Sequence, residues 1–119
     1  MPLSPRQHVL SETIGNVTVI RFKVDRLVAD EEILEFETEL NRLIEGPSPR
    51  VLLDFKALRQ MSSSALGKLL ALRRKIAESH GEFKLCRLNA DLREVFEITK
   101  LNQTFPIFDD EASALKSFH

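Results

Sequence analysis

Several residue types are scarce in this chain, and each scarcity excludes a class of structure. There is no tryptophan or tyrosine, so the aromatic part of any core must rest on eight phenylalanines. Cys86 is the only cysteine, which excludes an internal disulfide and a cysteine-based zinc cluster. No apolar run approaches the roughly 20 residues that cross a bilayer, and the first residues lack the apolar segment of a signal peptide. We therefore expect no membrane partner and a reducing, cytoplasmic location.

The net charge and the positions of the histidines and glycines argue against several further classes of function. The formal net charge is −1, so no general attraction to nucleic acid is expected. The histidines are scattered without ligand spacing, which argues against a metal site, and none is placed to activate a serine. The glycines are isolated, so no phosphate-binding loop is predicted. We expect neither an enzyme nor a cofactor. The three histidines are His8, His80 and His119, and the four glycines are Gly15, Gly46, Gly67 and Gly81.

Strand-like and helix-like patterns alternate along the chain, which predicts an α/β fold. His8–Ile14 and Val17–Val24 have strand character, and Gly15-Asn16 between them is typical of a tight hairpin. Helical connections between later strands imply parallel neighbours, so we expect a mixed sheet with an N-terminal antiparallel hairpin and alternating helices. The length suits a single domain over residues 1–119, with a core at about residues 8–118.

The boundaries of the later elements follow from periodicity and capping residues. The expected order is a helix opened by Asp30-Glu31-Glu32 and stopped by Gly46-Pro47, a buried strand at Val51–Leu53, a helix from Ser63 that ends at Gly81, a strand at Phe83–Leu88, a helix capped by Asn89, an edge strand at Phe105–Phe108, and a terminal helix capped by Asp109 or Asp110.

Residues 54–67 carry the most specific chemical feature. A buried strand ends at Phe55, and Ser62, Ser63 and Ser64 stand where a helix must begin. A phosphate is stabilised at such a position, because the backbone N–H groups and the positive end of the helix dipole point at it. Plain capping of the helix by a serine is the alternative interpretation of the same residues. The pattern thus favours a small phosphorylatable switch without deciding between modification and capping.

The element order and three stretches of sequence resemble the STAS domain, the fold of bacterial anti-sigma factor antagonists. Residues 61–67 read Met-Ser-Ser-Ser-Ala-Leu-Gly. They are similar to a turn in which the family carries Met or Ile and then Asp-Ser-(Ser/Thr)-Gly-Leu-Gly. Residues 92–101 are similar to the family's third helix, and residues 105–115 are similar to its closing strand and helix. Two positions depart from the family pattern, because Ser62 replaces the aspartate and Ala65 replaces a glycine.

This resemblance implies a regulatory function. In the family, an anti-sigma factor serine kinase phosphorylates the serine after the aspartate, which corresponds to Ser63 here, with Ser62 and Ser64 as alternatives. Unphosphorylated protein would bind the kinase and release a sigma factor, thereby regulating transcription, and phosphorylation would end the binding. The departure at Ser62 keeps an alternative open. The chain would then be a STAS scaffold or accessory subunit, of a signalling assembly or a lipid transporter, without a phosphorylation cycle.

Residues around the three serines are expected to contribute to the same site. Asp25 and Arg26 precede the first helix at the same end of the sheet, and together with the serines and Lys68 they are predicted to contact the partner. Asp54 ends the buried strand. It is expected either to accept hydrogen bonds from the Met61–Ser64 turn or to remain a solvated carboxylate. Cys86 is predicted to be an inert core residue. We expect a monomer or a weak dimer.

Overall fold

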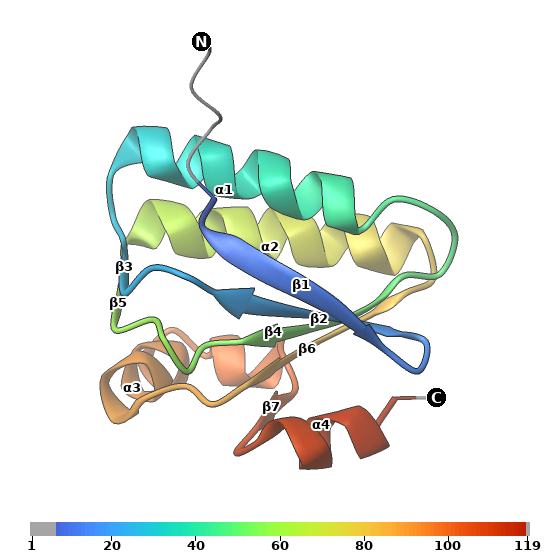
Figure 1. Ribbon diagram of the computed structural model, residues 1–119. Coiled ribbons are helices and arrows are strands. Elements are labelled where there is room, and N and C mark those ends of the chain that lie inside the picture. The colour runs from blue at the N-terminus through green and yellow to red at the C-terminus, as the bar shows by residue number, and fades with distance from the viewer. Residues whose placement is uncertain (1–6, 119) are drawn as a thin grey trace, which may run out of the picture.

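A mixed five-stranded sheet forms the centre of the computed structural model, which describes residues 7–118 (Figure 1). The elements are β1 (Val9–Ile14), β2 (Val17–Phe22), β3 (Arg26–Leu27), α1 (Asp30–Leu43), β4 (Arg50–Asp54), β5 (Gln60–Met61), α2 (Ser63–Glu78), β6 (Glu82–Cys86), α3 (Ala90–Ile98), a 3-10 helix (Leu101–Gln103), β7 (Ile107–Phe108) and α4 (Glu111–Lys116).

The strands of this sheet lie in the order β1-β2-β4-β6-β7. β1 pairs antiparallel with β2, whereas the pairs β2–β4, β4–β6 and β6–β7 are parallel. The predicted mixed sheet with its N-terminal hairpin is therefore confirmed. Residues 1–6 and 119 of the expected domain lie outside the described residues.

Local sequence signals located the ends of most elements. The hairpin turns at Gly15, whose φ of +62° is in the left-handed region. Asn89 caps α3, because its Oδ1 accepts a hydrogen bond from the Leu92 backbone N–H at 2.8 Å. Asp110, rather than Asp109, caps α4 by accepting from the Ser113 N–H at 2.7 Å. The two-residue strands β3 and β5 were not predicted, since two residues are too few to show a period.

Helices cover both faces of the sheet (Figure 1). α1 and α2 lie side by side over one face, where Phe36 of α1 stacks on Phe22 of β2 with ring centroids 5.4 Å apart. α3 joins the same core through Phe96, whose ring lies 6.2 Å from that of Phe55. α4 covers the other face, where Ala114 packs in a smaller cluster. That cluster contains Val17, Val19, Leu52 and Cys86.

The parallel strands β2, β4 and β6 point their carboxyl ends toward one edge of the molecule, at the left of Figure 1. β3, β5, the N-termini of α1 and α2, and α3 all gather at this edge. The carboxyl edge of the parallel strands is where loops of an α/β fold bring functional residues together. Here it holds the loop that leads from β4 to the three serines.

Candidate functional site: the serine loop at the start of α2

Ser62 caps α2, as the sequence predicted. Its backbone is extended, with φ −78° and ψ 165°, and its Oγ accepts a hydrogen bond from the Ala65 backbone N–H at 3.2 Å. The helix then begins at Ser63. Ala65 is a buried residue of the first turn, so alanine in place of the family's glycine leaves the start of the helix intact. No acidic residue occupies the first turn of α2, although α1, α3 and α4 each have one there.

The three serines differ in how available their hydroxyls are. Ser63 and Ser64 are exposed, and neither side chain makes a hydrogen bond with any part of the chain that the structure describes. Ser62 is half-buried and its hydroxyl is engaged as the cap. Ser63 therefore presents a free hydroxyl at the mouth of the helix, which is the geometry that the sequence led us to expect.

Backbone hydrogen bonds tie the serine loop to the segment before α1. The N–H groups of Arg59 and Gln60 donate to the carbonyl oxygen of Asp25 at 2.7 and 3.1 Å, and the Ser62 N–H donates to that of Leu27 at 3.0 Å. β3 and β5 pair in parallel through these residues, with Arg26 opposite Gln60. Asp25 and Arg26 thus lie beside the serine loop, as expected, and their contact with a partner stays a prediction.

Asp54 does not hold the serine turn, which corrects one sequence prediction. Its carboxylate is 1% exposed, so it is not a solvated strand end either. It accepts a hydrogen bond from the Lys56 N–H at 2.9 Å, and Arg87 donates to it through both Nε and Nη2. The physical reason is burial, because an ionised carboxylate inside a protein needs a charged partner. Arg87 provides that partner from the loop after β6.

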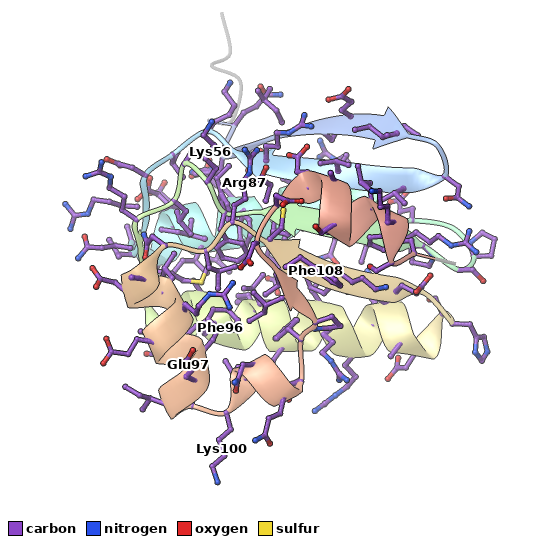
Figure 2. The ribbon with its side chains drawn as sticks, turned by 90° about the horizontal axis from the view of Figure 1, so that it is seen from below. Lys56, Arg87, Phe96, Glu97, Lys100 and Phe108 are labelled. Atoms are coloured by element: carbon purple, nitrogen blue, oxygen red, sulfur yellow. The ribbon has the colours of Figure 1, made fainter. Side chains whose placement is uncertain are left out.

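A network of ion pairs extends from Asp54 to α4. Arg87 also donates to Glu111 at 3.2 Å, and Arg21 of β2 donates to the two oxygens of Glu111 at 2.7 and 2.9 Å. Arg21 further donates to Glu12 of β1 at 2.6 Å. Figure 2 shows Arg87 near Lys56 at this edge, seen from below. Sequence reasoning missed the network, because its members come from four separate elements and the loop after β6 and carry no shared motif.

The pKa values of two carboxyls in this network are shifted in opposite directions from their ordinary values. The hydrogen bond from Arg21 lowers the pKa of Glu111 to about 2. Burial raises the pKa of Asp54, against the opposing effect of the Arg87 guanidinium. Burial also raises the pKa of the nearby Cys86 thiol to about 12, which agrees with the expected inert core cysteine. Glu111 is therefore the member whose negative charge the fold stabilises most clearly.

Asn89 connects the serine loop to α3. While its Oδ1 caps α3, its Nδ2 donates to the carbonyl oxygens of Leu58 and Arg59 at 3.3 and 3.5 Å. The backbone also contributes, since the Phe55 N–H donates to the Cys86 carbonyl at 2.9 Å. The loop that carries the serines is thus fastened from two sides. The sequence revealed the capping role of Asn89 and gave no sign of its second role.

Two hollows adjoin the serine loop at Ala57. The larger, of about 550 Å³, is lined by Lys23, Val24, Asp25, Arg26, Val28, Glu32 and Ala57. The smaller, of about 260 Å³, is lined by Arg21, Phe22, Asp54, Lys56, Ala57 and Arg87.

Lys68, predicted as a partner contact, forms an ion pair with Glu37 of α1 at 3.3 Å. Its role toward a partner stays a prediction.

Between residues 7 and 118, no three His, Cys, Asp or Glu side chains are grouped so that they could hold a metal ion. Within the same range, none of the helices combines the length and apolar character needed to cross a membrane.

Comparisons with known proteins agree on one family. The STAS domain pattern matches residues 8–114. BtrV of Bordetella bronchiseptica, a candidate anti-sigma factor antagonist, is 32% identical over 84 residues, which cover 71% of this chain and 72% of BtrV. A STAS domain protein from Planctomyces limnophilus superimposes with a TM-score of 0.84 at 24% identity, covering 92% of this chain and 96% of the other. The Bacillus protein SpoIIAA in its phosphorylated form superimposes with a TM-score of 0.70 at 21% identity, over 91% and 96% of the two chains.

Proposed function

Because this chain belongs to the STAS domain family, we propose that it is an anti-sigma factor antagonist switched by phosphorylation of Ser63. Unphosphorylated, it binds an anti-sigma factor kinase and so releases a sigma factor; phosphorylated, it no longer binds. The observation that carries the proposal is the free, exposed hydroxyl of Ser63 at the first position of α2. The names of its relatives support it, since BtrV is a candidate antagonist and SpoIIAA has a phosphorylated form.

The phosphoryl transfer needs little from this chain beyond a well-held acceptor. The Ser63 oxygen attacks the γ-phosphorus of ATP bound to the kinase, the new O–P bond forms as the bond to ADP breaks, and the hydroxyl proton passes to a base of the kinase. The serine loop is fixed by the backbone bonds to Asp25 and Leu27 and by Asn89. Ser63 therefore reaches a kinase without local unfolding.

The added phosphate changes the surface and preserves the fold. It contributes a charge of about −2 and three strong acceptor oxygens. At the start of α2 this charge meets the positive end of the helix dipole and no acidic side chain of the first turn. Against an apolar or acidic surface of the partner, the same charge without a counterion costs several kcal/mol, which is enough to abolish a micromolar complex.

A second function is favoured by the departure at Ser62. The family's aspartate would supply a negative charge beside the acceptor, and Ser62 supplies a neutral cap instead. A kinase that reads this aspartate would then ignore the chain. In that case the protein acts as a STAS scaffold or accessory subunit, of a signalling assembly or a lipid transporter, through the same surface and without a phosphorylation cycle.

Intact-mass spectrometry distinguishes the two functions. The purified protein is incubated with ATP and each anti-sigma factor kinase encoded by the same genome. We expect the wild type to gain one phosphate and Ser63→Ala to gain none, with Ser62→Ala as the matched control that is still modified. Modification of Ser63→Ala would move the acceptor to Ser62 or Ser64. A wild type that no kinase modifies, and that is captured from cells with a transporter ATPase, would support the scaffold function instead.

A further inference from the structure

α4 buries little of itself against the sheet. Of its six residues, only Ala114 is fully buried, and Leu115 is half-buried beside it. Among residues 7–118, no side chain of α4 belongs to the main core, which lies on the α1 and α2 face of the sheet (Figure 1). A helix of six residues is also too short to be stable alone. Polar contacts at its ends must therefore supply much of its attachment.

Three cationic side chains, from β2, β6 and the loop after β6, hold both ends of α4. At the start of the helix, Arg21 donates to the two oxygens of Glu111 at 2.7 and 2.9 Å, and Arg87 donates to the same carboxylate at 3.2 Å. Beyond the last turn, the Nζ of Lys84 donates to the Ser117 carbonyl oxygen at 2.7 Å and to the Ser117 Oγ at 2.9 Å. Lys84 is only 9% exposed, so its ammonium is enclosed between β6 and the end of α4.

Each of the three cations has a second anionic partner that does not belong to α4. These partners are Glu12 for Arg21 at 2.6 Å, Asp54 for Arg87 at 3.0 Å and Glu82 for Lys84 at 3.5 Å. Breaking a buried ion pair is costly because one charge is left behind without a partner. When α4 leaves the sheet, each cation stays paired and Glu111 passes into water with the helix. The polar contacts of α4 can therefore open without leaving an unpaired buried charge.

The surface beneath α4 is apolar and contains the only thiol of the chain. Cys86 is 0% exposed and lies in the cluster that Ala114 covers, together with Val17, Val19 and Leu52. The main core on the other face of the sheet is covered by α1 and α2 (Figure 1). Departure of α4 therefore uncovers the smaller cluster and leaves the main core closed.

We propose that α4 is a latch that opens while the rest of the fold stays intact, an inference that does not depend on the proposed function. In the closed state, which Figure 1 shows, α4 covers the cluster around Cys86. In the open state, residues 109–118 leave the sheet and the cluster meets water. The serine loop keeps its backbone hydrogen bonds to Asp25 and Leu27. Glu111 and Lys84 set the balance between the two states, because each holds one end of the latch.

Chemical labelling of Cys86 measures the opening, since a buried thiol reacts only after it is uncovered. The protein is mixed with an excess of an aromatic disulfide that releases a coloured thiolate, at urea concentrations below the unfolding transition. The labelling rate divided by the rate for the unfolded protein gives an equilibrium constant for exposure. Without urea, we expect it to exceed the constant for global unfolding by at least about tenfold, with less than about half of the urea dependence. Labelling no faster than global unfolding allows, with the full urea dependence, would overturn the proposal.

Two substitutions weaken the two ends of the latch separately. Glu111→Gln and Lys84→Met should each speed the labelling of Cys86 about tenfold without urea, because each removes a charge-assisted hydrogen bond that only the closed state makes. In the same variants, the amide hydrogens of α4 should exchange faster, while those of β2 and β4 exchange as slowly as in the wild type. Exchange that accelerates equally in β2 and β4 would mean that α4 opens only with the whole fold, which contradicts the proposal.

The matched controls alter the same residue types on the opposite face of the sheet. Glu37 pairs with Lys68 at 3.3 Å, and Lys75 donates to Asn41 at 2.9 Å, in both cases between α1 and α2. Glu37→Gln and Lys75→Met should change the labelling rate by less than about twofold, since exposed pairs of this kind contribute little. If the controls speed labelling as much as the latch variants do, Cys86 is reached through the main core and the proposal is wrong.

Discussion

Arg87 holds the carboxylate of Asp54 at the end of the central strand β4, with its Nε 3.0 Å from one oxygen and 3.1 Å from the other. The two partners differ in their access to water, since Asp54 is 1% exposed and the Arg87 side chain 32%. This asymmetry has an energetic consequence, because a residue that can reach water tolerates the loss of its partner better than one that cannot.

Arg87→Met should therefore cost more stability than Asp54→Asn. The first change leaves a buried carboxylate with only the Nε of Arg21, 4.0 Å away, as a cationic partner, which we expect to cost about 2–4 kcal/mol, whereas the second leaves a guanidinium that water can solvate, at about 1 kcal/mol. Urea unfolding of both variants measures the difference. The double variant should be more stable than Arg87→Met alone, because it removes the buried charge that has lost its closest partner. Equal costs for the two single changes would show that Asp54 reaches water in the folded protein.

Two substitutions at Asn89 should separate its role as the cap of α3 from its role as a hydrogen-bond donor to the serine loop. Asn89→Asp keeps the oxygen that caps α3 and loses the Nδ2 donor to Leu58, whereas Asn89→Ala loses both. We expect Asn89→Ala to lose about 1 kcal/mol more than Asn89→Asp, from the cap. Both should speed amide hydrogen exchange in residues 56–62. If amide exchange in residues 56–62 of Asn89→Asp is as slow as in the wild type, the backbone hydrogen bonds to Asp25 and Leu27 suffice to hold the loop.

Ser62 and Ser63 should respond in opposite ways to substitution. Ser62→Ala removes the cap and should cost about 1 kcal/mol of stability, measured by thermal or urea unfolding. Ser63→Glu should stay within about 1 kcal/mol of the wild type, because a carboxylate suits a helix start. Its binding to the anti-sigma factor kinase should nevertheless weaken, since it adds charge at the acceptor. A folded Ser63→Glu protein that binds as tightly as the wild type would argue against switching by charge.

The pKa values of the network predict how stability depends on acid. The pKa of Glu111 is lowered from 4.5 to about 2 in the folded protein, so its ionised form stabilises the fold. This contribution, about 3 kcal/mol, is complete above pH 4.5 and is lost as the pH falls from 4.5 to 2. The wild type should therefore be more stable than Glu111→Gln at pH 7, with a difference that disappears toward pH 2.

Asp54 contributes in the opposite direction, and its effect has to be separated. Burial raises the pKa of Asp54, so folding disfavours its charged form, and its contribution to stability grows as the pH falls through the folded pKa. Comparing Glu111→Gln with the parent in an Asp54→Asn background isolates Glu111. A stability difference that is independent of pH between 2 and 5 in this background would show that Glu111 keeps its ordinary titration.

The features that the sequence predicted are those that depend on a few neighbouring residues. Ser62 and Asn89 cap helices through bonds to N–H groups three residues ahead, so the residue type and the following periodicity reveal them. Once Ser62 is identified as the cap, Ser63 must be the first residue of α2. The prediction for Asp54 was wrong because the residues around it in the sequence contain no sign of Arg87, which lies 33 residues further on.

The amino-acid sequence by itself determined the order of the four α-helices and of the five strands of the main sheet, and the residue at which α2 begins, because hydrophobic periodicity and capping are read over short distances along the chain. Only the tertiary structure decided which charges meet, since Arg21 and Glu111 are 90 residues apart and their pairing depends on where β2 and α4 pack.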